Sequence, residues 1–385
     1  MNYYITNEHR KVLGLKPVEK NWDVIPMKYN EYGTYFLFFD KDTIKKIINI
    51  FQNSRYMYIR EDDVNYKTKE NRSIVLPKTN RGKDRKLNYT TITSFNGEGT
   101  YFYIQCDLKR KKGKFLIGNY TTQKTFYKKE EFDCDSIQNW LDDYTSNCTK
   151  EDIKEIENFS NEKRVHIKYK EGDYFRIKLD KNLYTYGRIL TDIYKRHKKG
   201  ENYWYVFMGR ALLIETFHIL TNRKDVSIEE LEMLKTFPSQ YIMDNKFYYG
   251  EYEIIGNKSL PEDINYPIMY GRSINAKNLN TIIFQCGFIH KEIPYTGNNL
   301  IKNDIDKNSS GLAYSDFKNN SIGWSFQNDI ETIKKCIKEN SNNPYWEHYE
   351  FDATVDLRSP QNKNKRKQVL KQMDVIYLLD KYKEE

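Results

Sequence analysis

The chain has few of the residue patterns that build metal or redox centres. Its five cysteines are scattered at irregular spacing, and no Cys-x-x-Cys pair occurs among them. The absence of such a pair excludes a zinc knuckle and a thioredoxin-type motif. An odd, scattered set of cysteines is typical of a reducing compartment, so we expect a cytoplasmic protein.

Motifs of catalysis are also missing. The six histidines form no His-x-His or His-Glu-x-x-His pattern and no His/Cys pair at ligand spacing, and there is no Gly-x-Ser-x-Gly elbow or Walker loop. Glu171 and Asp173 flank Gly172 as paired carboxylates, but acidic residues beside a Gly turn more often cap or solvate the loop. We therefore predict no catalytic residue, no metal and no cofactor, which favours a binding protein over an enzyme.

Long apolar runs are absent as well. The first residues contain no apolar core of a signal peptide, and no later stretch approaches the roughly 20 apolar residues that span a bilayer. We therefore expect no membrane association.

Aromatic residues, by contrast, are abundant, with 33 Tyr and 20 Phe. Such residues favour half-buried strands over helical bundles. Residues 33–120 are predicted to be mainly strands, with one helix at 44–51, where four apolar side chains recur at helical spacing after Asp40 or Asp42. The strands of this region are predicted at 35–39, 56–60, 64–68, 73–76, 100–106 and 114–120.

Two helices are predicted to close this first region. An apolar face at 137–144 follows helical spacing, and Thr149 with Asp152 forms a capping-box pattern ahead of apolar residues at 153–159. The polar stretch 160–164 then marks the best candidate for a domain boundary.

Short strands resume beyond this boundary. They are interrupted by a helix that Ser227 and Glu230 are expected to cap, and such a meander predicts a small, bent sheet or barrel. Ile333, Cys336 and Ile337 indicate one further helix, and residues 365–383 a last one. The strands are predicted at 165–169, 174–179, 183–190, 203–208, 211–220 and 246–255.

These patterns predict an α+β fold that is mainly β, with peripheral helices and a C-terminal helix. We expect an N-terminal β-rich domain closed by two helices (1–160), a second β domain (164–292) and a C-terminal extension with a loop and helices (293–385).

A basic loop between two predicted strands is the first candidate site for a partner. The chain has a net charge of +9, which favours acidic partners, either nucleic acid or protein. Cations on a Gly-containing loop could follow phosphates or meet an acidic protein surface, although a solvated loop is the common alternative. The cations of this loop are Lys78, Arg81, Lys83, Arg85 and Lys86.

Two other candidates lie in the second β domain. Gly187 inside a predicted strand suggests a bulge or a close backbone approach, from which Arg188 could present its guanidinium to a partner's carboxylate; the alternative is that Arg188 pairs within the fold. Trp204, between Tyr203 and Tyr205 and after a basic segment, suits an interface anchor.

Three short motifs lie in this second region, and the first two read KEGDYFRIKL at residues 170–179 and LYTYGRIL at residues 183–190. They resemble the EGD-x-F and Y-x-YGR strands of the immunity-protein-26 family. Residues 248–256 read YYGEYEIIG and resemble its W-x-VIG strand, with Tyr252 where Trp is usual. The resemblance covers about residues 164–275.

The resemblance implies an all-β domain from bacterial polymorphic-toxin systems, in which the protein binds a cognate toxin made by the same cell and neutralises it by occluding its surface. Two alternatives remain open. One is a nucleic-acid-binding component of an antiphage defence system that uses the basic loops. The other is a hydrolase, because some members of this grouping are described as phosphotriesterase-like.

Overall fold

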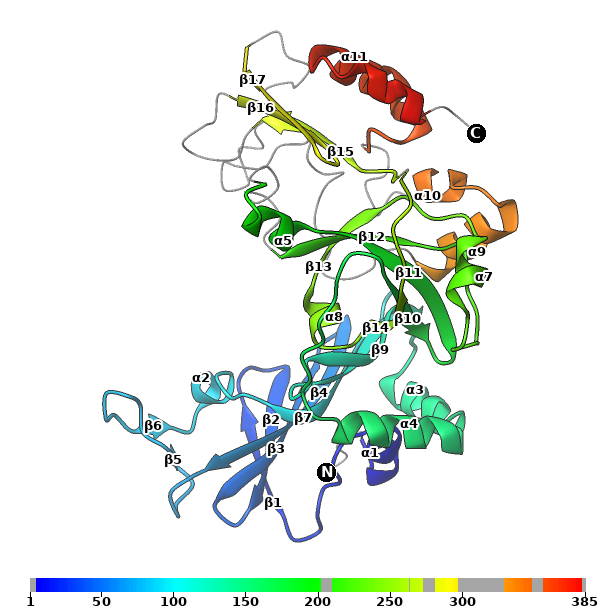
Figure 1. Ribbon diagram of the computed structural model, residues 1–385. Helices are drawn as coiled ribbons and strands as arrows, with labels where there is room; N and C mark the ends of the chain where they lie inside the picture. Colours follow the sequence, from blue (N-terminus) through cyan, green and yellow to red (C-terminus); the bar gives the residue numbers. More distant parts are fainter. Residues whose placement is uncertain are drawn as a thin grey trace. The chain divides into compact units, whose positions relative to one another are not determined.

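The computed structural model describes residues 5–201, 210–262, 264–272, 281–296, 329–347 and 356–382 (Figure 1). The chain divides into two compact units, Met1–His166 (unit 1) and Ile167–Glu385 (unit 2). Strand content exceeds helix content, which confirms the predicted α+β class with mainly β structure. None of the sheets in the described part closes into a barrel.

Unit 1 is built on a seven-stranded antiparallel sheet with the strand order β1-β2-β3-β4-β7-β8-β9. Neighbours in the sheet are neighbours along the chain, except that a two-stranded ribbon, β5 (Ile74–Val75) and β6 (Arg85–Lys86), is inserted between β4 and β7. The seven strands are β1 Asp23–Lys28, β2 Gly33–Asp40, β3 Thr43–Gln52, β4 Tyr56–Lys67, β7 Glu98–Asp107, β8 Lys112–Asn119 and β9 Lys124–Asp133.

The predicted helix at 44–51 is wrong, because these residues form the middle of β3. Lys41 and Asp42 make a two-residue turn, with Lys41 at a φ of 56°, that sends the chain straight back along β2. Side chains are buried on both faces of β3, and a bulge between Ile44 and Lys46 shifts its register. Apolar residues on both faces of a bulged strand imitate a helical period.

Three helices cover one face of this sheet: α1 (Asn7–Val12), α3 (Ile137–Ser146) and α4 (Lys150–Asn161). The predicted capping box at α4 is confirmed, since the backbone N–H of Asp152 donates to Thr149 Oγ1 at 3.1 Å and the N–H of Thr149 donates to the Asp152 carboxylate at 2.9 Å. A short helix, α2 (Tyr89–Ile92), contributes Ile92 to a smaller core on the other face.

One pair of cysteines in unit 1 is oxidised. Cys106 on β7 forms a disulfide with Cys134, which follows β9, and both residues are buried. The odd, scattered set of cysteines leads us to expect a reducing compartment, and that expectation does not anticipate this disulfide.

A buried charge network joins α1 to the sheet. Lys46 Nζ lies 2.6 Å from carboxylate oxygens of both Glu61 and Asp63, and the guanidinium of Arg10 donates to both oxygens of Glu61 at 2.8 and 3.1 Å. Burial alone would raise the pKa of Glu61, but Lys46 and Arg10 together lower it below its ordinary value. For Asp63, burial outweighs the single contact with Lys46 and raises the pKa. The network therefore requires all of its cations to balance the buried carboxylates.

Unit 2 contains an open five-stranded antiparallel sheet with the order β13-β12-β11-β10-β14. Its two faces both pack against apolar side chains, with Phe175 and Ile214 on one face and Tyr186 and Phe217 on the other. The elements are β10 Asp173–Asp180, β11 Leu183–Asp192, β12 Ala211–Thr216, β13 Gln240–Met243 and β14 Glu253–Asn257, with the helices α5 Ile193–Lys198, α7 Ile228–Glu232 and α8 Asn245–Tyr248.

Several predictions for unit 2 are corrected by the structure. The predicted strand at 246–255 begins instead with α8, because the backbone carbonyl of Asp244 accepts the N–H groups of Phe247 and Tyr248 and starts a helical turn. Residues 165–169 form no strand. The predicted cap of α7 is confirmed, since the N–H of Glu230 donates to Ser227 Oγ at 3.1 Å. The strand predicted at 203–208 lies outside the described residues.

The remainder of unit 2 is a three-stranded sheet with helices from the C-terminal part of the chain. The predicted helix at 365–383 is in fact two elements, because Asp374 adopts a φ of 52° and ends the first. The elements are β15 Ile268–Arg272, β16 Thr281–Cys286, β17 Ile289–Pro294, α9 Ile330–Glu339, α10 Asn343–Glu347, α11 Lys363–Gln372, and the short 3-10 helices η4 Pro360–Asn362 and η5 Ile376–Tyr382.

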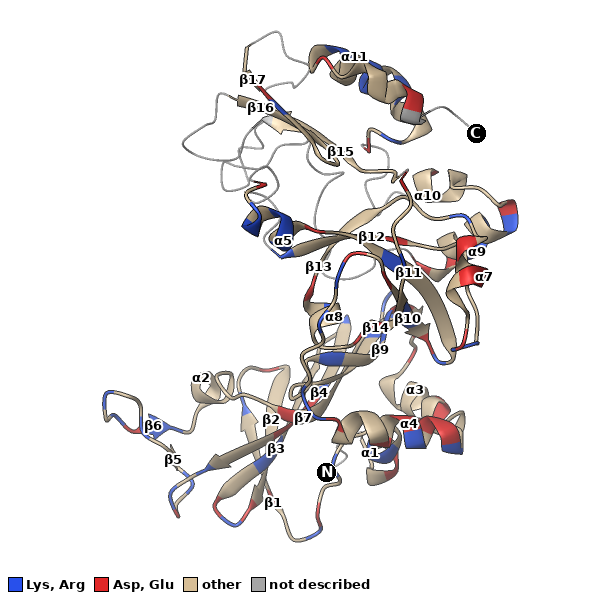
Figure 2. Ribbon diagram, in the orientation of Figure 1, with Lys and Arg blue, Asp and Glu red and all other residues tan. Residues whose placement is uncertain are grey.

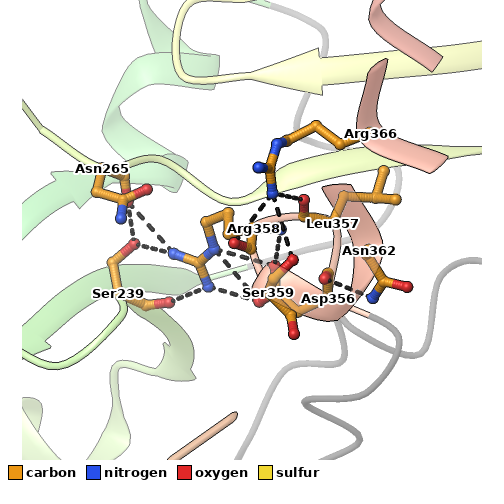
Figure 3. Close-up of polar contacts among 8 residues, drawn as sticks. All are labelled: Ser239, Asn265, Asp356, Leu357, Arg358, Ser359, Asn362 and Arg366. Carbon is orange, nitrogen blue, oxygen red and sulfur yellow. Dashed lines mark hydrogen bonds and ion pairs between the residues drawn. The ribbon is translucent and has the colours of Figure 1, made fainter. Parts of the chain in front are cut away.

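Buried arginines attach these C-terminal elements to the rest of unit 2 (Figure 3). The Arg358 guanidinium donates to the Asp356 carboxylate, with a shortest distance of 2.7 Å, and to Ser239 Oγ and the Ser239 carbonyl at 3.0 Å each. Arg366 Nη1 donates to the Leu357 carbonyl at 2.8 Å. Because Ser239 directly precedes β13, this cluster ties residues 356–366 to the five-stranded sheet.

Candidate partner-binding surfaces

The predicted basic loop forms an exposed arm, which we define as residues 68–87. Its strands β5 and β6 pair with each other, and β5 also bridges to Thr68. At the tip, the N–H of Gly82 donates to the Thr79 carbonyl at 2.8 Å, and the N–H of Thr79 donates to the Lys83 carbonyl at 2.9 Å. Gly82 has a φ of 74°, which glycine adopts without strain. The basic arm thus ends in a tight, hydrogen-bonded turn and projects from the sheet of unit 1 (Figure 1).

Two of the five predicted cations are engaged within the arm or at its base. Lys78 Nζ lies 3.4 Å from the Asp84 carboxylate. The Arg85 guanidinium lies about 6 Å from the ring centres of Tyr66 and Phe95, which stack on each other at 3.8 Å. The Arg85 contact holds the base of the arm against β4, and the Lys78–Asp84 pair joins the two sides of the tip.

The other three cations point into solvent. Among the described residues, the side chains of Arg81, Lys83 and Lys86 have no ion pair, hydrogen bond or ring contact, and all three residues are exposed. Figure 2 shows basic residues along this ribbon. The structure therefore brings together a set of uncompensated positive charges at the place that the sequence predicts.

Arg188 is engaged within the five-stranded sheet. Its guanidinium donates to the Glu215 carboxylate on the neighbouring strand β12 and to the Tyr174 hydroxyl at 3.2 Å, and its side chain is only 12% exposed. A Cβ atom at Gly187 would collide with the Glu215 carbonyl, which explains the glycine at that position. Arg188 therefore pairs within the fold, which is the second of the two interpretations that the sequence allows.

Helix α5 carries a second cationic surface, which we call the α5 surface. Asp192 caps the helix by accepting the N–H of Lys195 at 3.0 Å. Arg196 donates to both oxygens of Glu171 at 2.9 and 2.8 Å, and its guanidinium lies 4.6 Å from the ring centre of Phe288. The Phe288 side chain, on the turn between β16 and β17, is 49% exposed. An exposed aromatic ring backed by a fixed guanidinium is suited to anchoring a partner.

Further cations extend the α5 surface. Lys198 and Arg210 lie 4.7 and 5.0 Å from the ring centre of Tyr194, and the contact with Lys198 lowers the pKa of the Tyr194 hydroxyl. Figure 2 shows this basic helix. The sequence contains a signal for this helix, an Asp at the N-cap position followed by a basic last turn. The predicted anchors Tyr203, Trp204 and Tyr205 lie outside the described residues.

The described residues contain neither a metal-binding cluster nor a membrane-spanning helix. Nowhere in this part of the chain do three or more His, Cys, Asp and Glu side chains gather closely enough to hold a metal ion. Of the helices that the structure describes, none has both the length and the apolar character needed to cross a membrane.

Comparison with known proteins identifies one segment. Residues 170–281 match the family model described as Immunity protein 26. The matched segment contains the whole five-stranded sheet, helices α5, α7 and α8, and strand β15, and it covers less than a third of the chain. The resemblance predicted from the three motifs is confirmed, and the match supports an immunity-protein role in general terms. No curated protein and no solved structure matches the chain.

Proposed function

We propose that this chain is an immunity-type binding protein that neutralises a cognate toxin by covering the toxin's working surface. The observation that carries the proposal is the match of residues 170–281 to Immunity protein 26. That match spans the open sheet and helix α5, whereas Phe288 lies just beyond it on the β16–β17 turn. A protein that neutralises a toxin by covering its working surface needs only a stable interface. A typical stable complex buries about 1,600 Å² of accessible surface, summed over both partners.

The α5 surface is the part of unit 2 best suited to this contact. Interfaces depend on a few aromatic and arginine anchors surrounded by polar residues. Phe288 supplies an exposed ring, and Arg196 is held in place by Glu171 so that little side-chain entropy remains to be lost on binding. Lys198 adds positive charge that would accelerate association with an acidic toxin surface, whereas the charge of Lys195 is balanced by Asp192 at 3.0 Å.

Growth rescue tests this proposal. The products of the genes that flank this chain's own gene are each expressed from an inducible promoter, with or without the full chain, and growth is followed after induction. The proposal predicts that the chain restores growth and that the Phe288→Ser variant restores it poorly. A matched control is Met233→Ser, which also removes an exposed apolar side chain (86% exposed) from unit 2 and should protect as well as the wild type. Continued growth arrest in the presence of the folded wild-type chain would refute the proposal.

A further inference from the structure

The basic arm of unit 1 lies outside the segment that matches Immunity protein 26, and its charge is unusually one-sided. From Tyr66 to Lys86 the chain has eight Lys and Arg residues against only Glu70 and Asp84, a surplus of six within a chain whose net charge is +9. Asp84 is already contacted by Lys69 at 3.5 Å and Lys78 at 3.4 Å. The distal cations are therefore available to an anionic partner.

The chemistry of the arm favours phosphate over a protein surface. Cores of protein interfaces are enriched in aromatic residues and depleted in lysine. The arm has no aromatic residue at its tip, because its exposed residues 77–84 are three cations, Thr79, Asn80, one proline, one glycine and the paired Asp84. Phosphate oxygens, in contrast, are contacted by Lys and Arg together with Thr and Asn, such as Thr79 and Asn80 at the tip.

The shape of the arm favours double-stranded DNA over single strands and over RNA. Proteins that bind single strands stack bases on aromatic side chains, and residues 73–87 contain none. The major groove of B-form DNA, about 12 Å wide, admits a two-stranded β-ribbon, whereas the major groove of A-form RNA is too deep and narrow. The hydrogen-bonded turn at Thr79–Lys83 fixes the tip before any partner arrives.

We propose that the basic arm binds double-stranded DNA by placing its hydrogen-bonded tip, residues 77–84, in the major groove, where Arg81, Lys83 and the neighbouring Lys86 contact backbone phosphates. The contact is independent of sequence because these cations would neutralise phosphates rather than read bases. This activity belongs to unit 1 and does not depend on the toxin-binding role proposed for unit 2.

Fluorescence anisotropy with a labelled 20-base-pair DNA duplex of mixed sequence tests the proposal on the full chain. Neutralisation of three phosphates predicts a slope of log affinity against log salt of about −2.7, so that affinity falls about 40-fold between 50 and 200 mM KCl. The triple variant Arg81→Ala, Lys83→Ala, Lys86→Ala should lose this binding and its salt dependence.

The matched control removes the same charge elsewhere. Lys334, Lys335 and Lys338 are exposed on α9, and their triple alanine variant should bind the duplex as the wild type does. Equal loss in the two triple variants would show a non-specific effect of net charge and would overturn the proposal. Tighter binding of a single strand or of an RNA duplex of the same length, or equally effective competition by poly-glutamate, would also overturn it. Circular dichroism of each variant confirms folding.

Discussion

Removal of the Arg358 side chain should cost unit 2 a large part of its stability. Arg358 and Asp356 are both buried, with side chains 3% and 6% exposed, and the guanidinium also satisfies Ser239 Oγ and the carbonyl groups of Ser239 and Asn265. Arg358→Ala leaves the Asp356 carboxylate buried without its cation. Breaking a buried ion pair in this way costs about 3–5 kcal/mol.

Hydrogen exchange followed by mass spectrometry localises this effect to unit 2. The slowest amides of β13 and α11, which the Arg358 cluster joins, should exchange roughly 150- to 5,000-fold faster in Arg358→Ala, the equivalent of 3–5 kcal/mol. Arg223→Ala removes an arginine of the same unit from an exposed pair with Glu230 and should exchange much as the wild type does.

A double variant supplies the decisive comparison. Asp356→Ala combined with Arg358→Ala removes the stranded carboxylate and should recover part of the lost protection. Wild-type exchange rates in Arg358→Ala, or faster exchange in the double variant than in the single one, would refute the assignment of a stabilising buried pair. If Arg358→Ala does not accumulate as folded protein, Arg358→Lys, which keeps the charge but loses the forked geometry, should give an intermediate rate.

Two other predictions concern buried charges. Lys46→Met leaves Glu61 and Asp63 buried with too few cations and should lower the free energy of unfolding by about 3–5 kcal/mol, whereas Lys45→Met, next to it but on the solvent-facing side, should change a urea denaturation curve little. Burial lowers the pKa of His218, so the unfolded chain binds a proton first as pH falls below about 6.5. Stability should therefore decrease over that pH range in urea titrations, and by less in His218→Gln; equal pH dependence of the two proteins would contradict this.

The sequence predicted most interior strands of the two larger sheets and about half of the described helices, but it missed β3 and the edge strands β1, β9 and β13. The aromatic and Ile-rich strands β2, β4, β7 and β8 contain continuous or alternating apolar residues, because they are packed between neighbours. β1 contains Pro26, and β9 is largely exposed and charged. Edge strands tolerate proline and carry charge to prevent aggregation, so their sequences look like loops.

The candidate sites differ in whether their residues lie close together in the sequence. The basic arm could be predicted because its charge and its Gly82 turn are local properties of the sequence. The pairing of Arg188 with Glu215 could not, since the partner lies 27 residues away on another strand. The same applies to the α5 surface, where Phe288 reaches Arg196 only after the β16–β17 turn is placed beside α5.

Isothermal titration calorimetry of the purified full chain with the toxin that it neutralises in the growth assay tests the central claim most directly. The proposed role predicts a saturable complex, and loss of the aromatic anchor in Phe288→Ser should raise its Kd by about 30-fold or more, the effect of a hot spot of about 2 kcal/mol, while Met233→Ser leaves the Kd unchanged. The absence of any binding between the two folded proteins at micromolar concentrations would contradict the account.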